Sequence, residues 1–218
     1  AQANAALAAA ALNGLRVDTG ETLSFNQTVG LRTSEAGYQA AEEPAYGQNV
    51  SGVGGGVCQV STALYRLALL GGLEIGERNA AVYPVDYCDV GQEAAVSDQG
   101  LDLKIVNSTS MPVFLTARVY ADGDGQTMEL QLIGLELDES YTLASETETI
   151  APPEEPIYVR DSEGRYAAYS DERIPVGEPM PGYRVTVRLI SETDEKIVSQ
   201  DEYDAIPQII YVGVSQRP

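Results

Sequence analysis

The sequence predicts an α+β domain followed by a small all-β module, and three features of the chain lead to this prediction. Helical patterns occur in the alanine-rich start and in the segment that follows Gly56. From Leu73 onward, apolar and polar residues alternate as they do in half-buried strands. Acidic residues and prolines then fill a stretch that resists packing. We therefore expect an α+β domain over residues 1–137, an acidic linker or extended strand over 138–156, and an all-β module over 157–218.

The composition excludes several classes of protein. Hydrophobic residues make up 44% of the 218 residues, which is enough for a core and argues against global disorder. The net charge is −20, so nucleic acid and anionic membrane surfaces are poor partners. The simplest interpretation of this charge is solubility. No run approaches the roughly 18 apolar residues of a transmembrane helix, and we expect no membrane insertion within this chain.

The alanine-rich start predicts an amphipathic helix. Leu7 and Leu12 are expected to face inward, and Gly14 is expected to end the helix. The segment lacks the basic region of a signal peptide, so we expect the chain to begin inside a longer precursor.

Strands are expected on both sides of a second helix. Leu23 and Phe25 should lie on one face of a short strand, and residues 31–52 should form a loop. Residues 80–90 are rich in β-forming residues, with Pro84 at an edge or bulge.

A β-hairpin is predicted over residues 111–137. Its turn, "ADGDGQ", has the Asp-Gly pattern typical of hairpins. Asp122 and Asp124 also resemble the start of a calcium loop, but the other ligands of such a loop are missing. In the C-terminal module, Val185 and Val187 should share one strand face with Leu189.

The segment "GGGVCQVSTALY" carries the candidate site. Three glycines precede Cys58, and a helix is predicted from about Cys58 to Leu70, ended by Gly71 and Gly72. A helix N-terminus lowers the pKa of a thiol. The glycines either let a ligand approach the backbone or only form a tight turn. The candidate ligand-binding residues are Gly54, Gly55, Gly56, Cys58, Gln59, Ser61 and Thr62.

Two of these residues have a simpler interpretation. Ser61 and Thr62 lie in the first helical turns, where their hydroxyls are expected to bond backbone groups. The alternative is that they line a pocket for a peptide or a sugar.

Catalysis by Cys58 would have to proceed without an imidazole, because the chain contains no histidine. The carboxylates of Asp86, Glu93 and Asp102 are poor substitutes, because negative charge raises the pKa of a nearby thiol. Two thiols without histidine do not make a zinc site, and no phosphate-binding loop is present. We expect neither a metal nor a cofactor.

Cys58 has two structural interpretations besides catalysis. It is either a small buried side chain or one half of a disulfide with Cys88. Such a bridge would stabilise the domain by about 3 kcal/mol.

Several blocks of the chain resemble the VanW-like family of bacterial envelope proteins. They are "GETLSFNQTVGLRTSEAGYQAA", "GGGVCQVSTALYRLALLGGLEIGER" and "DLKIVNSTSMPV", and the resemblance covers about residues 4–135. The last strands, ending in "YDAIPQIIYVGV", are similar to G5-type β modules. The resemblance implies a secreted or membrane-anchored protein, in a family that includes the namesake of a glycopeptide-resistance gene cluster. Family members often lie next to peptidoglycan-binding modules. No established reaction is implied.

The chain departs from the family pattern at the positions that are expected to neighbour the cysteine. Members commonly have Glu-Arg-His-x-His where this chain has Glu77-Arg78-Asn79-Ala80-Ala81, so both histidines are replaced. The usual Asp-Ala-Thr-Val is here "EAAV", which starts at Glu93. In typical members, the order of cysteine, histidine and aspartate is similar to that in transglutaminase- and papain-like folds.

Two functional hypotheses follow. The first is a non-catalytic, extracytoplasmic envelope protein that binds peptidoglycan peptide, glycan or a cell-wall-associated protein. The second is an amidase or transferase that acts on cell-wall peptides and depends on Cys58.

Overall fold

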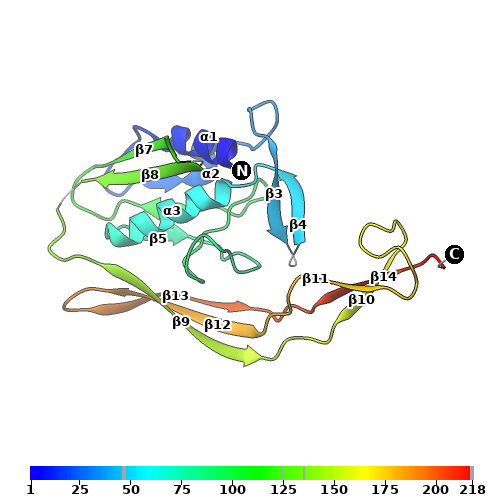
Figure 1. Ribbon diagram of the computed structural model, residues 1–218. Coiled ribbons are helices and arrows are strands. Elements are labelled where there is room, and N and C mark those ends of the chain that lie inside the picture. The colour runs from blue at the N-terminus through cyan, green and yellow to red at the C-terminus, as the bar shows by residue number, and fades with distance from the viewer. Residues whose placement is uncertain (46–47, 124, 135, 217–218) are drawn as a thin grey trace. The chain divides into compact units, whose positions relative to one another are not determined.

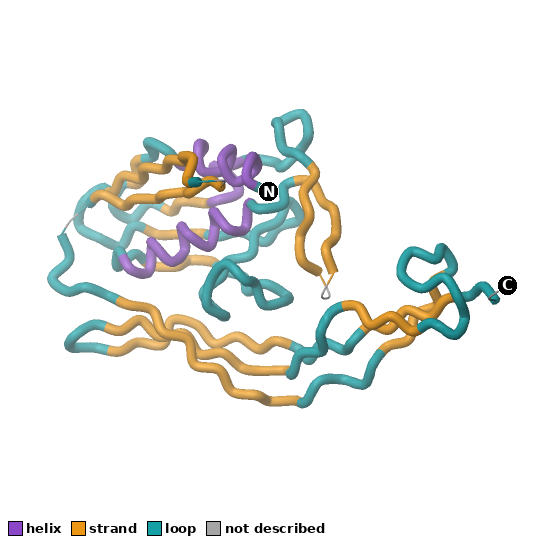
Figure 2. The backbone as a smooth tube through the Cα atoms, viewed as in Figure 1, coloured by secondary structure: helices purple, strands orange, loops and turns teal. Residues whose placement is uncertain are grey.

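A computed structural model of the chain describes residues 1–45, 48–123, 125–134 and 136–216. The fold is mixed α+β with mostly strands, as predicted (Figure 1). The helices, purple in Figure 2, are α1 (Gln2–Leu12), α2 (Phe25–Val29) and α3 (Val57–Leu70). The strands are β1 (Arg16–Val17), β2 (Thr22–Ser24), β3 (Ala40–Ala45), β4 (Gln48–Val53), β5 (Glu74–Glu77), β6 (Lys104–Val106), β7 (Val113–Asp122), β8 (Gly125–Ile133), β9 (Thr142–Ala151), β10 (Ile157–Asp161), β11 (Arg173–Val176), β12 (Gly182–Ile190), β13 (Glu195–Tyr203) and β14 (Ile209–Gly213).

The chain divides into two compact units, and α1, α2 and α3 belong to the first. The first unit comprises Ala1–Glu43, Ser51–Glu146 and Thr186–Gln200, and the second comprises Pro44–Val50, Thr147–Val185 and Asp201–Pro218. The strand orders are β1-β7-β8, β2-β6-β5, β3-β4, β13-β12-β9 and β10-β14-β11. In the described part of the chain, no helix is both long and apolar enough to cross a membrane.

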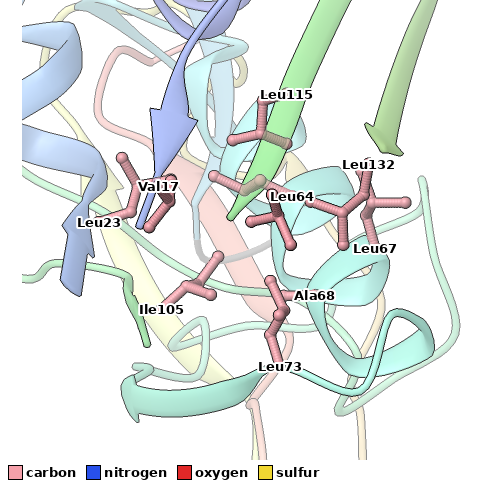
Figure 3. A pocket seen from close by; sticks show the side chains of 10 residues that line it. Val17, Leu23, Leu64, Leu67, Ala68, Leu73, Ile105, Leu115 and Leu132 are labelled. Atoms are coloured by element: carbon pink, nitrogen blue, oxygen red, sulfur yellow. The ribbon is translucent and has the colours of Figure 1, made fainter. Parts of the chain in front are cut away.

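Helix α3 lies at the centre of the hydrophobic core. Val60, Leu64 and Ala68 recur at helical spacing, and all three are buried. Leu115 from β7 and Ile105 from β6 are buried in the same cluster. Figure 3 shows ten side chains around a small apolar cavity of about 10 Å³ beside α3. A space of this size and polarity is a packing gap rather than a ligand site.

Helix α3 ends where the sequence predicts. The Gly71 N–H donates to Leu67 O at 2.9 Å, and the Leu73 N–H donates to Ala68 O at 2.9 Å. Gly72 has φ +71°, the left-handed conformation that favours glycine and closes a helix in this way. The two glycines therefore set the boundary between α3 and β5.

The predicted hairpin over residues 111–137 is confirmed. β7 and β8 pair antiparallel from Phe114↔Ile133 to Asp122↔Gly125. Asp122 accepts a hydrogen bond from Thr127 Oγ1 at 2.9 Å, as suits a turn residue. Asp124, the other residue of the calcium-loop comparison, lies outside the described residues.

The face of α1 differs from the prediction at one residue. Leu12 is fully buried, but Leu7 is 39% exposed. The buried face consists of Asn4, Ala8 and Leu12, which follow at intervals of four residues, together with Ala9. Leu7 lies outside this face because the buried position is occupied by Asn4, whose polar atoms form hydrogen bonds in the core.

The start of the chain contains one further difference. Phe25 does not continue the strand of Leu23 but begins α2. Ser24 caps this helix, because its Oγ accepts a hydrogen bond from Gln27 N at 3.1 Å. The N-cap signal overrides the local alternation.

The predicted loop over residues 31–52 is wrong in part, because it contains β3 and β4. The predicted strand over 80–90 is also wrong, since this segment has no regular secondary structure. Its neighbourhood is organised by hydrogen bonds to a buried carboxylate, Glu93, instead of by strand pairing. Cys88 therefore lies in an irregular segment.

The C-terminal half is built of strands. β9 fills most of the segment predicted as a linker or extended strand, and it is a strand because it pairs with β12. Val185 and Val187 of β12 are fully buried, and Leu189 on the same face is partly buried.

Candidate functional site

The head of α3 is shaped by glycines. Gly54 has φ +97° and Gly56 has φ +98°, so both adopt the left-handed conformation. A Cβ on Gly56 would lie 2.8 Å from Ala1 O, and one on Gly54 would lie 3.0 Å from Arg32 Cβ. Chain geometry and close packing therefore account for these two glycines without a ligand.

Asn4 connects α1 to this glycine turn. Its side chain is fully buried, and Nδ2 donates to Gly55 O at 3.0 Å and to Gln39 O at 2.9 Å. Its Oδ1 accepts from Gln39 N at 2.8 Å. One buried amide thus fixes the backbone on both sides of β3 and β4.

Cys58 lies half-buried in the first turn of α3. Its Sγ donates to Val96 O at 3.5 Å. Ser61 Oγ donates to Ala94 O at 2.6 Å, and Thr62 Oγ1 accepts from Ala94 N at 3.0 Å. Residues 93–96 therefore run along the first turns of α3.

These contacts distinguish the predicted ligand-binding residues. Ser61 and Thr62 are buried and bond backbone groups, in keeping with the simpler of the two interpretations. Gly54 and Gly55 are buried as well. Gln59 is exposed, which leaves it accessible to a ligand.

Glu93 is fully buried and forms an ion pair with Arg78. Arg78 Nη2 lies 3.1 Å from Glu93 Oε1, and Arg78 Nε donates to the backbone oxygen of Glu93 at 2.7 Å. The Glu93 carboxylate also accepts from Gly91 N at 2.8 Å and from Ala81 N at 3.3 Å. The Arg78 guanidinium lies 5.5 Å from the ring centroid of Tyr65. Because both oxygens of Glu93 accept hydrogen bonds, this carboxylate is a structural anchor.

The structure brings together the three chain segments that the family comparison singled out. Ala95 N donates to Asn79 O at 2.8 Å, so residues 93–96 lie between α3 and the segment from Asn79 to Ala81. Asn79 Nδ2 donates to Asp102 O at 3.0 Å. The positions of the two missing histidines therefore lie beside the Glu93 segment.

The other predicted acidic residues have separate places. Asp102 is buried and accepts from Ser24 Oγ at 2.6 Å and from Asn26 N at 2.9 Å. It thus stabilises the start of α2. Asp86 is exposed. Among the described residues, no three Asp, Glu or Cys side chains are grouped closely enough to hold a metal ion.

Two residues near Cys58 have raised pKa values. Burial, followed by the charges of Cys58, Cys88 and Glu93, raises the pKa of Tyr87 far above its usual range, and a hydrogen bond with Thr62 acts in the opposite direction. Burial, and then the charge of Glu93, raises the pKa of Cys88 to about 11. Both groups are therefore protonated at neutral pH.

The structure shows no disulfide between Cys58 and Cys88, so the bridge that the sequence allows stays a prediction. The sequence analysis missed Tyr87 and the role of Arg78 as neighbours of this site. The sequence held one indication for Arg78, which directly follows a strand of the domain. An arginine that is buried at such a position needs a carboxylate partner.

Comparison with known proteins identifies the family. A family model described as VanW like protein matches residues 1–131. The uncharacterized protein YoaR of Bacillus subtilis is 38% identical over 117 residues, which cover 54% of this chain and 39% of YoaR. The vancomycin B-type resistance protein VanW of Enterococcus faecalis is 30% identical over 179 residues, which cover 79% of this chain and 61% of that protein.

The chain thus spans less than two thirds of the length of each of these relatives. No solved structure matches it. The family model stops before the C-terminal strands, whose similarity to G5-type modules stays a prediction. Since the match includes the whole head of α3 and extends over more than half of the sequence, the chain belongs to the VanW-like family.

Proposed function

We propose that this chain is a non-catalytic domain of the bacterial cell envelope that binds peptidoglycan outside the cytoplasmic membrane. The observation that carries the proposal is the state of Glu93. This carboxylate lies at a position that the family pattern singles out, in the segment that runs along the first turns of α3. It is fully buried, it pairs with Arg78, and both of its oxygens accept hydrogen bonds. With no histidine in the chain, this site has a thiol without a group suited to carry its proton.

The location in the envelope is supported by the relatives. The name of the Enterococcus faecalis relative links it to vancomycin resistance. Peptidoglycan, either its peptide or its glycan, is the ligand class that fits this context, and a wall-associated protein is the second. The C-terminal strands would serve as an additional module of the G5 type.

Binding to whole cell-wall sacculi tests the proposal. The purified chain is incubated with sacculi, sedimented, and compared with an unrelated protein of equal size and net charge. We expect retention of the chain above this control, and equal retention of Cys58→Ala, because binding does not need the thiol. Retention no greater than that of the acidic control overturns the proposal.

A second function, an amidase or transferase dependent on Cys58, is favoured by one observation. Cys58 lies half-buried in the first turn of α3, where the dipole of a helix favours a thiolate. In this case the family's transglutaminase- or papain-like arrangement would be retained. Release of wall fragments by the wild type, abolished in Cys58→Ala and in Cys58→Ser, would establish the enzyme. Failure of iodoacetamide to label Cys58 in the native protein would exclude it.

A further inference from the structure

The β7–β8 hairpin, green in Figure 1, forms one edge of the first unit's strands. Its outer face carries an unusual set of side chains. Val113, Leu115 and Ala117 of β7 point into the core, so the alternate residues face away from it. We call the following residues the outer strip: Phe114, Thr116, Arg118 and Tyr120 of β7, with Glu129 and Gln131 of β8. Ile133 and Thr127 of β8 lie opposite Phe114 and Tyr120 on the same face, and Ile133 is 53% exposed.

The two ends of the outer strip are exposed aromatic rings. Phe114 is 44% exposed and Tyr120 is 46% exposed. They lie six residues apart on one strand, which corresponds to about 20 Å. The guanidinium of Arg16 lies 5.9 Å from the Phe114 ring centroid, and that of Arg118 lies 5.8 Å from the Tyr120 centroid. These contacts help to hold each ring in place.

The middle of the outer strip is polar but electrically balanced. Arg118 donates from Nε at 2.9 Å and from Nη2 at 2.7 Å to Glu129 Oε2. Gln131 Nε2 donates to Glu129 Oε1 at 2.5 Å, and Thr116 Oγ1 donates to Gln131 Oε1 at 3.4 Å. The result is a row of fixed donors and acceptors without net charge, on a chain whose net charge is −20.

A hollow of about 420 Å³ lies along this polar row. It is lined by Thr116, Arg118, Glu129 and Gln131 of the outer strip, together with Ala117 and Asn13. Asn13 Oδ1 accepts from Ala117 N at 2.9 Å, which holds the side chain of Asn13 against β7. A volume of this size is within the range of ligand sites.

We propose that the outer strip binds a glycan strand of the cell wall. Sugar hydroxyls both donate and accept hydrogen bonds, so they suit a row of carboxylate, guanidinium and amide groups that is already neutralised. The apolar faces of two sugar rings fit the rings of Phe114 and Tyr120. A protein partner fits less well, since the centre of a protein interface is apolar whereas the centre of this strip is polar. This inference rests on the proposed function and names the part of the wall that is bound.

Fluorine NMR tests the inference on the unmodified sequence. The chain contains two phenylalanines, so 4-fluorophenylalanine labelling gives two signals. Phe25 is fully buried and serves as an internal reference. Glycan strands freed from their peptides by an amidase are then added. We expect the Phe114 signal to shift in a saturable way while the Phe25 signal stays in place. A Phe114 signal that stays unchanged up to the highest concentration of strands overturns the proposal.

Substitutions give a second readout, the Kd for the same peptide-free strands. Tyr120→Ala and Phe114→Ala should each weaken binding about three- to tenfold, and Tyr120→Phe should retain it. Tyr158→Ala is the matched control, because Tyr158 is a 62% exposed aromatic residue on β10. Its Kd should equal that of the wild type. Equal losses in Tyr158→Ala and Tyr120→Ala would contradict a site on the outer strip.

The failure of this inference can be separated from failure of the proposed function. Binding to whole sacculi and to isolated stem peptides, without binding to peptide-free strands, overturns the glycan assignment and leaves the proposed function intact. Absence of binding to sacculi overturns both.

Discussion

The guanidinium of Arg78 and the carboxylate of Glu93 form a buried ion pair, 3.1 Å from Nη2 to Oε1, with the side chains 7% and 1% exposed. A charge pair removed from water is costly to break, because the remaining charge has no solvent to stabilise it. This pair joins the start of residues 93–96 to the chain that follows β5, while hydrogen bonds with Ser61 and Thr62 hold the same segment to α3. Glu93 therefore has a supporting role in the fold.

Breaking this pair should destabilise the chain strongly. Glu93→Gln and Arg78→Met should each lower the free energy of unfolding by about 3–5 kcal/mol, as measured by urea unfolding. Arg118→Gln is the matched control, because Arg118 forms an exposed ion pair with Glu129. Its effect should stay below about 1 kcal/mol. A loss of unfolding free energy in Arg118→Gln as large as that in Glu93→Gln and Arg78→Met would show that the buried pair has no special role.

Gly56 should not tolerate a side chain. Gly56→Ala combines φ +98° with a Cβ placed 2.8 Å from Ala1 O. Gly20→Ala is the control, because Gly20 has φ +78° but open space around its Cβ. We expect a loss of about 1–2 kcal/mol for Gly20→Ala from backbone conformation alone, and a clearly larger loss for Gly56→Ala. Thermal unfolding of the two variants measures the difference.

The buried amide of Asn4 should be equally sensitive. Asn4→Ala leaves the Gly55 and Gln39 carbonyls and the Gln39 N–H without the partner they have in the wild type. A buried polar group left unsatisfied costs about 1–3 kcal/mol. Hydrogen exchange should therefore become faster at Gln39 N–H in Asn4→Ala. Unchanged exchange there would mean that another group replaces the asparagine.

Alkaline pH should weaken the fold through Cys88. Its pKa rises from 9.0 to about 11, with burial as the main cause. In the unfolded chain the thiol loses its proton near pH 9, whereas in the folded chain it keeps it up to about pH 11. The stability linked to this thiol is thus fully present below pH 9 and is lost as the pH rises towards 11. The free energy of unfolding, measured in urea between pH 8 and 11, should fall less steeply for Cys88→Ser than for the wild type.

The same pKa shift predicts slow alkylation of Cys88. A rise of two pH units reduces the thiolate fraction about 100-fold at neutral pH. Iodoacetamide labelling at pH 8, followed by peptide mass analysis, should be slower at Cys88 in the native protein than in urea by at least this factor. Equal rates in the two conditions would contradict the burial of the thiol.

The elements that the sequence predicted well are those with a local signal. Helix α3 has apolar residues at helical spacing and two glycines at its end, and the β7–β8 hairpin has alternation on both strands with an Asp-Gly turn. Both signals lie within a few residues of the element they describe. They are therefore readable without knowledge of tertiary contacts.

The elements that were missed depend on residues distant in sequence. Residues 80–90 are rich in β-forming residues, yet the backbone at both ends of this segment donates hydrogen bonds to the buried carboxylate of Glu93, at Ala81 N and Gly91 N. The place of Asn4 in the core depends on carbonyls of Gln39 and Gly55. No local pattern marks either relationship. For the candidate site, the family comparison placed the right segments together, but only the structure identified Arg78 and Tyr87 as neighbours.

The hydrogen bond from Asn4 to Gly55 joins residues that are 51 positions apart. The turn before Cys58 therefore depends on the docking of α1 for one of its hydrogen bonds. If α1 were displaced, the Gly55 carbonyl would lose the Asn4 amide as its partner. The turn next to the cysteine therefore depends on a helix that is distant in sequence but in direct contact with it.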